Sequence, residues 1–110
     1  MRSERDITVI HVIATVEVIP GKREALLAEF QKLVPLVRAE DGCLEYGPTI
    51  DVASGLAAQG SVREQVVTVV EKWTSLEALR AHTQAPHMLE YRARVKEMVG
   101  GVKLQVLRPA

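Results

Sequence analysis

The apolar periodicity of the chain changes from that of a strand to that of a helix at Pro20-Gly21, and this change constrains the fold more than any other feature. From Ile7 to Ile19 the chain is rich in Val and Ile, and every even position from 10 to 18 is apolar, which is typical of a strand that buries one face. After Pro20-Gly21, apolar residues recur at helical spacing; they are Leu26, Phe30, Leu33 and Val37. Pro35 should kink this predicted helix, and Gly42 is a suitable left-handed cap for its end.

Two further strands are predicted in the middle of the chain. The first covers Cys43–Val52, where Gly47-Pro48 favours a bulge or an edge position because proline cannot donate to a strand ladder. The second covers Gln65–Trp73 and is centred on a run of β-branched residues. Between them, residues 53–65 form a loop rich in Gly and Ala that is predicted to be flexible. Such a loop serves either as a lid over a pocket or as variable surface.

The last third of the chain predicts a broken helical region and a final strand. Thr74 and Glu77 have the spacing of a capping box, which places the start of a helix at Thr74. Pro86 suits the first turn of a helix and restarts it after a short break. Gly100-Gly101 is expected to end that helix, and Val102–Leu107 is the last predicted strand.

The predicted order of elements is the ferredoxin-like βαββαβ arrangement. It is an α+β fold in which both helices cover one face of a four-stranded antiparallel sheet. All 110 residues fit a single domain, with residues 1–6 expected to be a flexible N-terminus. Val9 and Ile13 lie on the side of the sheet that the two helices leave uncovered. We therefore expect a homodimer that packs through the open sheet face.

The composition limits the classes of partner. Fourteen basic residues balance fourteen acidic residues without a basic cluster, so neither nucleic acid nor an anionic membrane surface is an expected partner. No apolar stretch approaches the roughly 20 residues of a membrane span. Cys43 is the only cysteine, which excludes an intrachain disulfide and agrees with a cytoplasmic location.

Four local patterns resemble the antibiotic biosynthesis monooxygenase family, whose members form dimeric α+β barrels. The patterns are Val18-Ile19-Pro20-Gly21-Lys22, Glu40-Asp41-Gly42-Cys43-Leu44-Glu45-Tyr46, Glu71-Lys72-Trp73-Thr74-Ser75 and Ala81-His82-Thr83-Gln84-Ala85-Pro86-His87. They occur in the family's order and extend across nearly the whole chain. Two features depart from the family: Asp41 replaces the usual proline of the second pattern, and the loop 53–65 is longer than the expected short turn.

The resemblance implies a cofactor-independent monooxygenase that uses O2 to oxidise a small quinol, polyphenol or polyketide-type aromatic, with neither metal nor flavin. Such a reaction needs a base near neutral pH, hydrogen bonds that hold the ring, and a dry apolar cavity. His82 is the candidate catalytic base; the alternative is a partly exposed helix histidine bonded to a backbone carbonyl. The alternative functions are a non-oxidative isomerase of a small carbonyl metabolite and a non-catalytic dimer that binds a small ligand.

Five further residues are candidates for substrate binding, and each has a structural alternative. They are Trp73, Glu71, Tyr46, His87 and Tyr91. The indole of Trp73 either donates to a substrate oxygen or anchors the core, and the two tyrosines either line the cavity or pack. Glu71, on the same strand face, either tunes the candidate base or pairs with Arg80 or Arg92. His87, in the first turn of a helix, favours a neutral hydrogen-bonding or packing role.

Neither a metal site nor a cofactor site is predicted. His82 and His87 lie on either side of a helix break and lack the spacing that places two ligands on one helix face, and Cys43 is distant in sequence. Haem-binding relatives with this fold are expected to use a histidine on the last helix, which offers none beyond His87. No glycine-rich phosphate loop precedes a helix.

Overall fold

The computed structural model describes residues 8–110, so the predicted strand start at Ile7 and the predicted flexible residues 1–6 lie outside the described residues. The elements in chain order are β1 (Ile10–Val18), α1 (Arg23–Arg38), β2 (Cys43–Thr49), β3 (Val66–Trp73), α2 (Leu76–Thr83), α3 (Pro86–Val95) and β4 (Val99–Leu107). The second helical region is broken before Pro86, as predicted. The ferredoxin-like α+β fold predicted from the sequence is confirmed.

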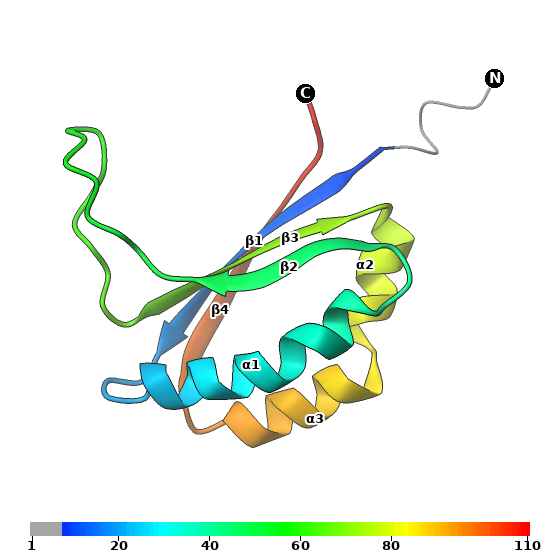
Figure 1. Cartoon of the computed structure of the whole chain (residues 1–110), viewed down its shortest axis with the longest axis horizontal. Coiled ribbons are helices and arrows are strands. Elements are labelled where there is room, and N and C mark those ends of the chain that lie inside the picture. The colour runs from blue at the N-terminus through cyan, green and yellow to red at the C-terminus, as the bar shows by residue number, and fades with distance from the viewer. Residues whose placement is uncertain (1–7) are drawn as a thin grey trace.

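The four strands form one antiparallel sheet in the order β2-β3-β1-β4. The even positions of β1 face the helices and are all buried; they are Ile10, Val12, Ala14, Val16 and Val18. The register pairs Val12 with Glu71 and Ala14 with Val69, so this part of β3 faces the same side. Figure 1 shows α1 and α3 lying across this side of the sheet, with α2 at one end. The side chains of this sheet face therefore form one wall of the interior.

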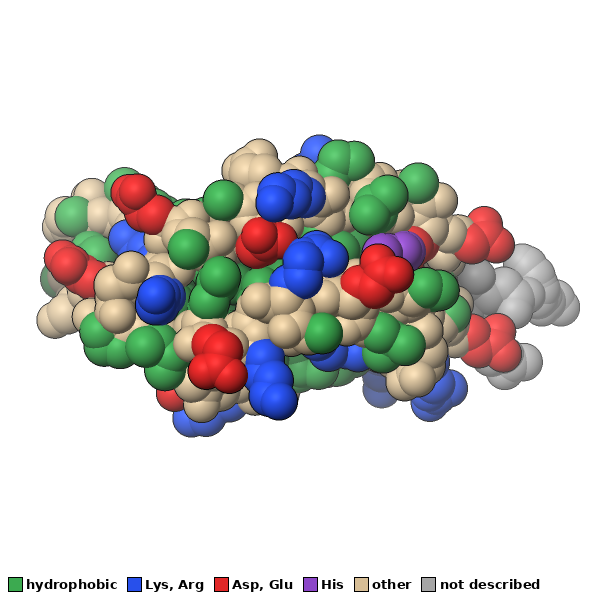
Figure 2. Space-filling model, turned by 90° about the horizontal axis from the view of Figure 1, so that it is seen from below, with side chains coloured by type: hydrophobic (Ala, Val, Ile, Leu, Met, Phe, Trp, Pro, Cys, Tyr) green, Lys and Arg blue, Asp and Glu red, His purple; other side chains and the backbone are tan. Residues whose placement is uncertain are grey.

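Helix α1 buries the four residues that its period predicts. Leu26, Phe30, Leu33 and Val37 are each at most 2% exposed, and burial of such side chains contributes about 1.5–3 kcal/mol each. The helix runs through Pro35 and ends at Arg38, earlier than the predicted stop at Asp41-Gly42. Over the outer surface of the helical layer, basic and acidic side chains are interspersed with apolar ones (Figure 2). None of the helices between residues 8 and 110 is long and apolar enough to cross a membrane.

The cap of α2 differs from the prediction by one residue. The Ser75 hydroxyl accepts a hydrogen bond from the N–H of Ala78 at 3.0 Å, which makes Ser75 the N-cap. Thr74, the predicted cap, donates its backbone N–H to the carbonyl of Gly42 at 2.9 Å. This bond keeps Thr74 aligned with the turn before β2, so the helix begins after it. Gly42 has the expected positive φ, 83°, but within that turn, because the C-cap of α1 is already at Ala39.

One strand prediction also needs correction. Gly100-Gly101 lies inside β4, where Gly101 pairs with Glu17 of β1, and does not end the helix. On the other edge of the sheet, β2 contains Gly47-Pro48 and is an edge strand, as predicted. Its pairing irregularity lies between Cys43 and Glu45 instead of at Gly47-Pro48.

Residues 50–65 form an arm that projects beyond the sheet (Figure 1, green). The guanidinium of Arg63 donates to both carboxylate oxygens of Asp51 at 2.8 and 2.9 Å, and its backbone N–H adds a third bond at 2.9 Å. These hydrogen bonds lower the pKa of Asp51 to about 2. The arm therefore has internal contacts despite its Gly and Ala content, and it contributes no side chain to the cavity described below.

The sheet face opposite the helices carries several apolar residues. Ile13 and Val70 are paired partners at its centre, and Val70 remains 38% exposed. The hydroxyl of Thr68, on the same face, is buried without a hydrogen-bond partner among the described residues. This face is therefore apolar and partly exposed, as the sequence predicts for the side of the sheet that the helices leave uncovered.

Candidate active site

A cavity of about 490 Å³ lies between the sheet and helices α2 and α3. Most of its lining is apolar, including Val12, Ala14, Val16, Val69, Leu79, Met88, Val95, Val102 and Leu104. Its few polar lining residues are Tyr46, Glu71, His82, Thr83, Tyr91, Arg92 and Lys96. An apolar cavity of this size with a few polar groups is typical of a site for one small molecule. Val102 and Leu104 of β4 are 55% and 54% exposed. The helices therefore leave this wall of the cavity uncovered.

Glu40 holds two imidazoles against one carboxylate beside this cavity. Nδ1 of His82 lies 3.0 Å from Oε2 and 3.2 Å from Oε1 of Glu40, and Nε2 of His87 lies 2.5 Å from Oε2. The three residues come from the turn after α1, from α2 and from the first turn of α3. The two helices separate at Pro86, which suits the start of a helix because it lacks an N–H. Among residues 8–110, no cluster of three or more His, Cys, Asp or Glu side chains has an arrangement that could hold a metal ion.

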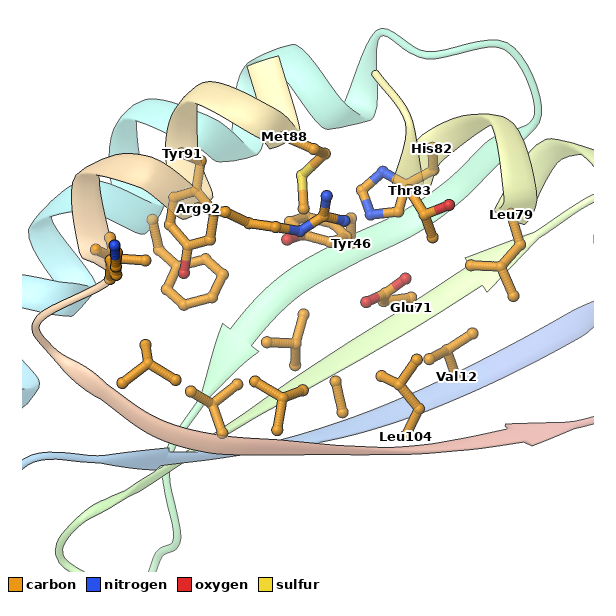
Figure 3. A pocket seen from close by; sticks show the side chains of 18 residues that line it. Val12, Tyr46, Glu71, Leu79, His82, Thr83, Met88, Tyr91, Arg92 and Leu104 are labelled. Atoms are coloured by element: carbon orange, nitrogen blue, oxygen red, sulfur yellow. The ribbon is translucent and has the colours of Figure 1, made fainter. Parts of the chain in front are cut away.

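The contact with Glu40 assigns the proton of His82 to one ring nitrogen. A carboxylate only accepts hydrogen bonds, so Nδ1 donates, and in the neutral imidazole Nε2 carries the lone pair. Figure 3 shows the far edge of this ring directed into the cavity, towards Glu71. The indole of Trp73 and the ring of Tyr46 contact the imidazole, with centroids 4.7 and 5.5 Å away, and fix its plane. His82 is therefore a buried, oriented acceptor that faces the cavity.

Glu71 is the second acidic residue of the site, on the β3 wall of the cavity below His82 (Figure 3). The indole Nε1 of Trp73 donates to Glu71 Oε1 at 2.9 Å. Trp73 is fully buried and does not line the cavity, so its N–H is used within the protein and not on a ligand. Glu71 forms no ion pair with Arg80 or Arg92 in the described structure. Burial raises the pKa of Glu71, and the Trp73 hydrogen bond and the nearby His82 partly oppose that rise.

We expect Glu71→Gln to stabilise the protein at neutral and alkaline pH. A carboxyl whose pKa is higher in the folded than in the unfolded state opposes folding once it ionises. This cost is absent below the unfolded-state pKa and develops as the pH rises towards and through the folded-state pKa. Glutamine keeps the oxygen that accepts from Trp73 and removes the charge. Urea denaturation should show a higher midpoint than wild type at about pH 8 and an equal midpoint at about pH 4; a lower midpoint at pH 8 would contradict the assignment.

Tyr46 and Tyr91 both line the cavity, from β2 and α3. Burial raises the pKa of each phenol well above its usual range, so both hydroxyls are protonated at neutral pH. Neither hydroxyl bonds to another described residue, which leaves both available to a ligand. His87 does not line the cavity; its contact with Glu40 matches the hydrogen-bonding alternative.

Two residues of the site were not singled out by sequence reasoning. Glu40 follows a helix end next to Asp41-Gly42, where acidic residues are usually solvated, and its histidine partners are 42 and 47 residues away. Arg92 was considered only as a partner of Glu71, but it lines the cavity from α3. No local pattern indicates either role, because both depend on how α2 and α3 are placed on the sheet.

Comparison with known proteins identifies similar sequences and similar folds. The family model described as antibiotic biosynthesis monooxygenase matches residues 9–94. The chain is 39% identical over 100 residues to "Probable quinol monooxygenase YgiN" of Escherichia coli strain K12, covering 89% of this chain and 95% of that protein. The structure of Rv0793 from Mycobacterium tuberculosis has a TM-score of 0.74 at 32% identity, covering 93% of this chain and 95% of that one. The crystal structure of PA3566 from Pseudomonas aeruginosa has a TM-score of 0.76 at 29% identity, covering 94% and 95%.

Proposed function

Because this chain belongs to the antibiotic biosynthesis monooxygenase family, we propose that it is a cofactor-independent monooxygenase that oxidises a small quinol or polyphenol with O2. The observation that carries the proposal is the orientation of His82. Its Nδ1 is held by Glu40, and its Nε2 faces an apolar cavity. The name of the related Escherichia coli protein supports a quinol as the class of substrate.

The geometry supplies what the first step of such a reaction needs. A quinol hydroxyl that lies against Nε2 of His82 transfers its proton to the imidazole, and the carboxylate of Glu40 stabilises the resulting imidazolium. The electron-rich phenolate then passes one electron to O2, which gives a semiquinone radical and superoxide. These combine, with a proton, to a hydroperoxide on a ring carbon, which loses water and leaves one oxygen atom on the ring of the resulting quinone. The quinol supplies all the electrons, so the reaction requires no metal or flavin. The apolar walls exclude water from the reactive species. Tyr46 and Tyr91 are placed to donate hydrogen bonds to the substrate oxygens.

Oxygen uptake by the purified, metal-stripped protein tests the proposal. The protein is mixed with a panel of reduced quinols and polyphenols, and the rate is corrected for autoxidation. Uptake that saturates with substrate concentration is the expected result. Isomerisation of a carbonyl compound and simple sequestration of a ligand consume no oxygen. Absence of uptake above background across the panel would therefore overturn the monooxygenase.

We further propose that the open sheet face packs against a second copy of the chain. Its support is the apolar pair of half-buried Ile13 and exposed Val70, and the buried hydroxyl of Thr68, which has no hydrogen-bond partner among the described residues. Analytical ultracentrifugation should show a dimer that Val70→Lys shifts towards monomer. The matched control Leu89→Lys, at an exposed position of α3, should leave the dimer intact. A wild-type monomer at every concentration would contradict the proposal.

We also expect the protein to work in the cytoplasm, where a reducing environment keeps its lone thiol free. Cys43 is half-buried, and burial raises the pKa of its thiol. A protonated thiol is a poor nucleophile, so we assign Cys43 no chemical role.

A further inference from the structure

Two cations of α3 line the cavity without a partner. Arg92 and Lys96 are the only basic side chains apart from His82 among the described lining residues, and neither forms a hydrogen bond or ion pair within the described structure. Figure 3 shows the side chain of Arg92 extended across the cavity from α3. Two residues further along the same helix, Arg94 donates to Glu29 at 2.8 Å. Arg92 therefore differs from Arg94 in that it lines the cavity and has no partner among the described residues.

The surroundings of Arg92 favour an anion. The neighbouring lining is apolar, with Met88 and Val95 on the same helix, and charge interactions are stronger beside apolar walls than in open water. A guanidinium presents a planar pair of donors that matches a carboxylate. An unpaired guanidinium above an apolar cavity thus has the geometry to bind a carboxylate carried by the ligand.

Glu71, the acidic residue that lines the cavity, determines in which orientation such a ligand binds. Glu71 projects from the sheet on the side of His82, and its carboxyl disfavours a second negative group there. Arg92 on α3 and Lys96, the C-cap of α3, lie across the cavity from β3. A ring with a hydroxyl at one end and a carboxylate at the other therefore places its hydroxyl against His82 and its carboxylate against Arg92.

We propose that Arg92, assisted by Lys96, selects hydroxylated aromatic acids, so that the preferred substrate is a quinol that also carries a carboxylate. This inference refines the proposed function by naming the charge of its substrate. It predicts that a carboxylated quinol binds more tightly than the same quinol without the acid.

Anaerobic isothermal titration calorimetry with hydroquinone and gentisate, its carboxylated form, tests the inference. We expect wild type to bind gentisate at least about tenfold more tightly, since a hydrogen-bonded ion pair contributes about that factor. Arg92→Gln should abolish the preference for gentisate over hydroquinone. Arg94→Gln, the matched control on the other side of α3, should keep it.

Three outcomes would overturn the inference: equal affinity of wild type for the two ligands, an unchanged preference in Arg92→Gln, or no binding of gentisate at millimolar concentration. Anaerobic binding involves no turnover, so this test is separate from that of the monooxygenase. A gentisate preference without oxygen uptake would leave the binding site in place and refute the oxidation. Oxygen uptake without a gentisate preference would support the monooxygenase and refute the selection of a carboxylate by Arg92.

Discussion

Replacing His82 by alanine should lower the rate of oxygen uptake with a quinol substrate by about 10²–10⁴-fold, the usual contribution of a positioned general base. The variant keeps the apolar walls and both tyrosine hydroxyls, so the dissociation constant of the substrate should change little. The loss should therefore appear in kcat and not in KM. Stopped-flow or electrode measurements of oxygen uptake, paired with anaerobic binding, separate the two constants.

His82→Ala also removes a donor from Glu40, whose carboxylate is only 12% exposed, so a second variant is needed. Glutamine at position 82 still offers an N–H to Glu40 but has no basic nitrogen, and it should lose activity to a similar extent. Arg80→Ala, at an exposed position of the same helix, is the control and should retain wild-type rates. Full activity in both His82 variants would assign the base to another residue.

Replacing Gly42 by alanine should destabilise the fold by about 3 kcal/mol, the sum of a left-handed backbone cost of roughly 1–2 kcal/mol and an overpacking cost of similar size. Gly42 has φ of 83°, and an added Cβ would lie 2.6 Å from Cβ of Ala78 and 2.7 Å from Oγ1 of Thr74. The turn that holds Gly42 would have to move away from the start of α2. Urea denaturation followed by the fluorescence of Trp73 measures the loss.

Gly21→Ala separates the two parts of this cost. Gly21 has almost the same φ, 85°, but apart from its two chain neighbours no atom of residues 8–110 lies within 4 Å of an added Cβ. Its replacement should cost only about 1–2 kcal/mol, the backbone part alone. Equal losses in the free energy of unfolding of the two variants would show that crowding of the added Cβ at position 42 against α2 costs nothing. Because Glu40 lies in the same turn, the Gly42 variant should also lose oxygen uptake out of proportion to its unfolding.

The fold could be predicted from the sequence because its periodicities are local. The alternation in β1, the helical stripe of α1 and the placement of Pro86 each depend on residues within one element. The errors fall at boundaries, where distant contacts decide. Gly100-Gly101 has the composition of a helix stop, but pairing with β1 supplies backbone hydrogen bonds that keep it in a strand. Likewise, Thr74 has the spacing of a cap, but the bond from its N–H to Gly42 delays the helix by one residue.

The candidate site was only partly predictable, for a similar reason. His82, Tyr46, Tyr91 and Glu71 all line the cavity, and their residue types and the family resemblance were sufficient to single them out. The partners that orient them were not. Glu40 approaches His82 only because the turn after α1 and the break between α2 and α3 meet, and no residue pattern encodes that meeting. Of the two roles considered for Trp73, the fully buried indole that donates to Glu71 matches the core anchor.

The pairing of β1 with β4 sets the order in which the molecule is completed during translation. β1 precedes the other described elements in the chain, but its partner along one whole edge, from His11 opposite Leu107 to Val18 opposite Val99, is synthesised after all of them. A nascent chain can begin to fold β1, α1, β2 and β3 as they emerge from the ribosome. The pairing of β4 with β1 joins residues that are far apart in sequence, and such pairing is slow. Val102 and Leu104, one wall of the cavity, arrive only with that final strand. The cavity therefore acquires its last wall only after β4 has followed the other six described elements out of the ribosome.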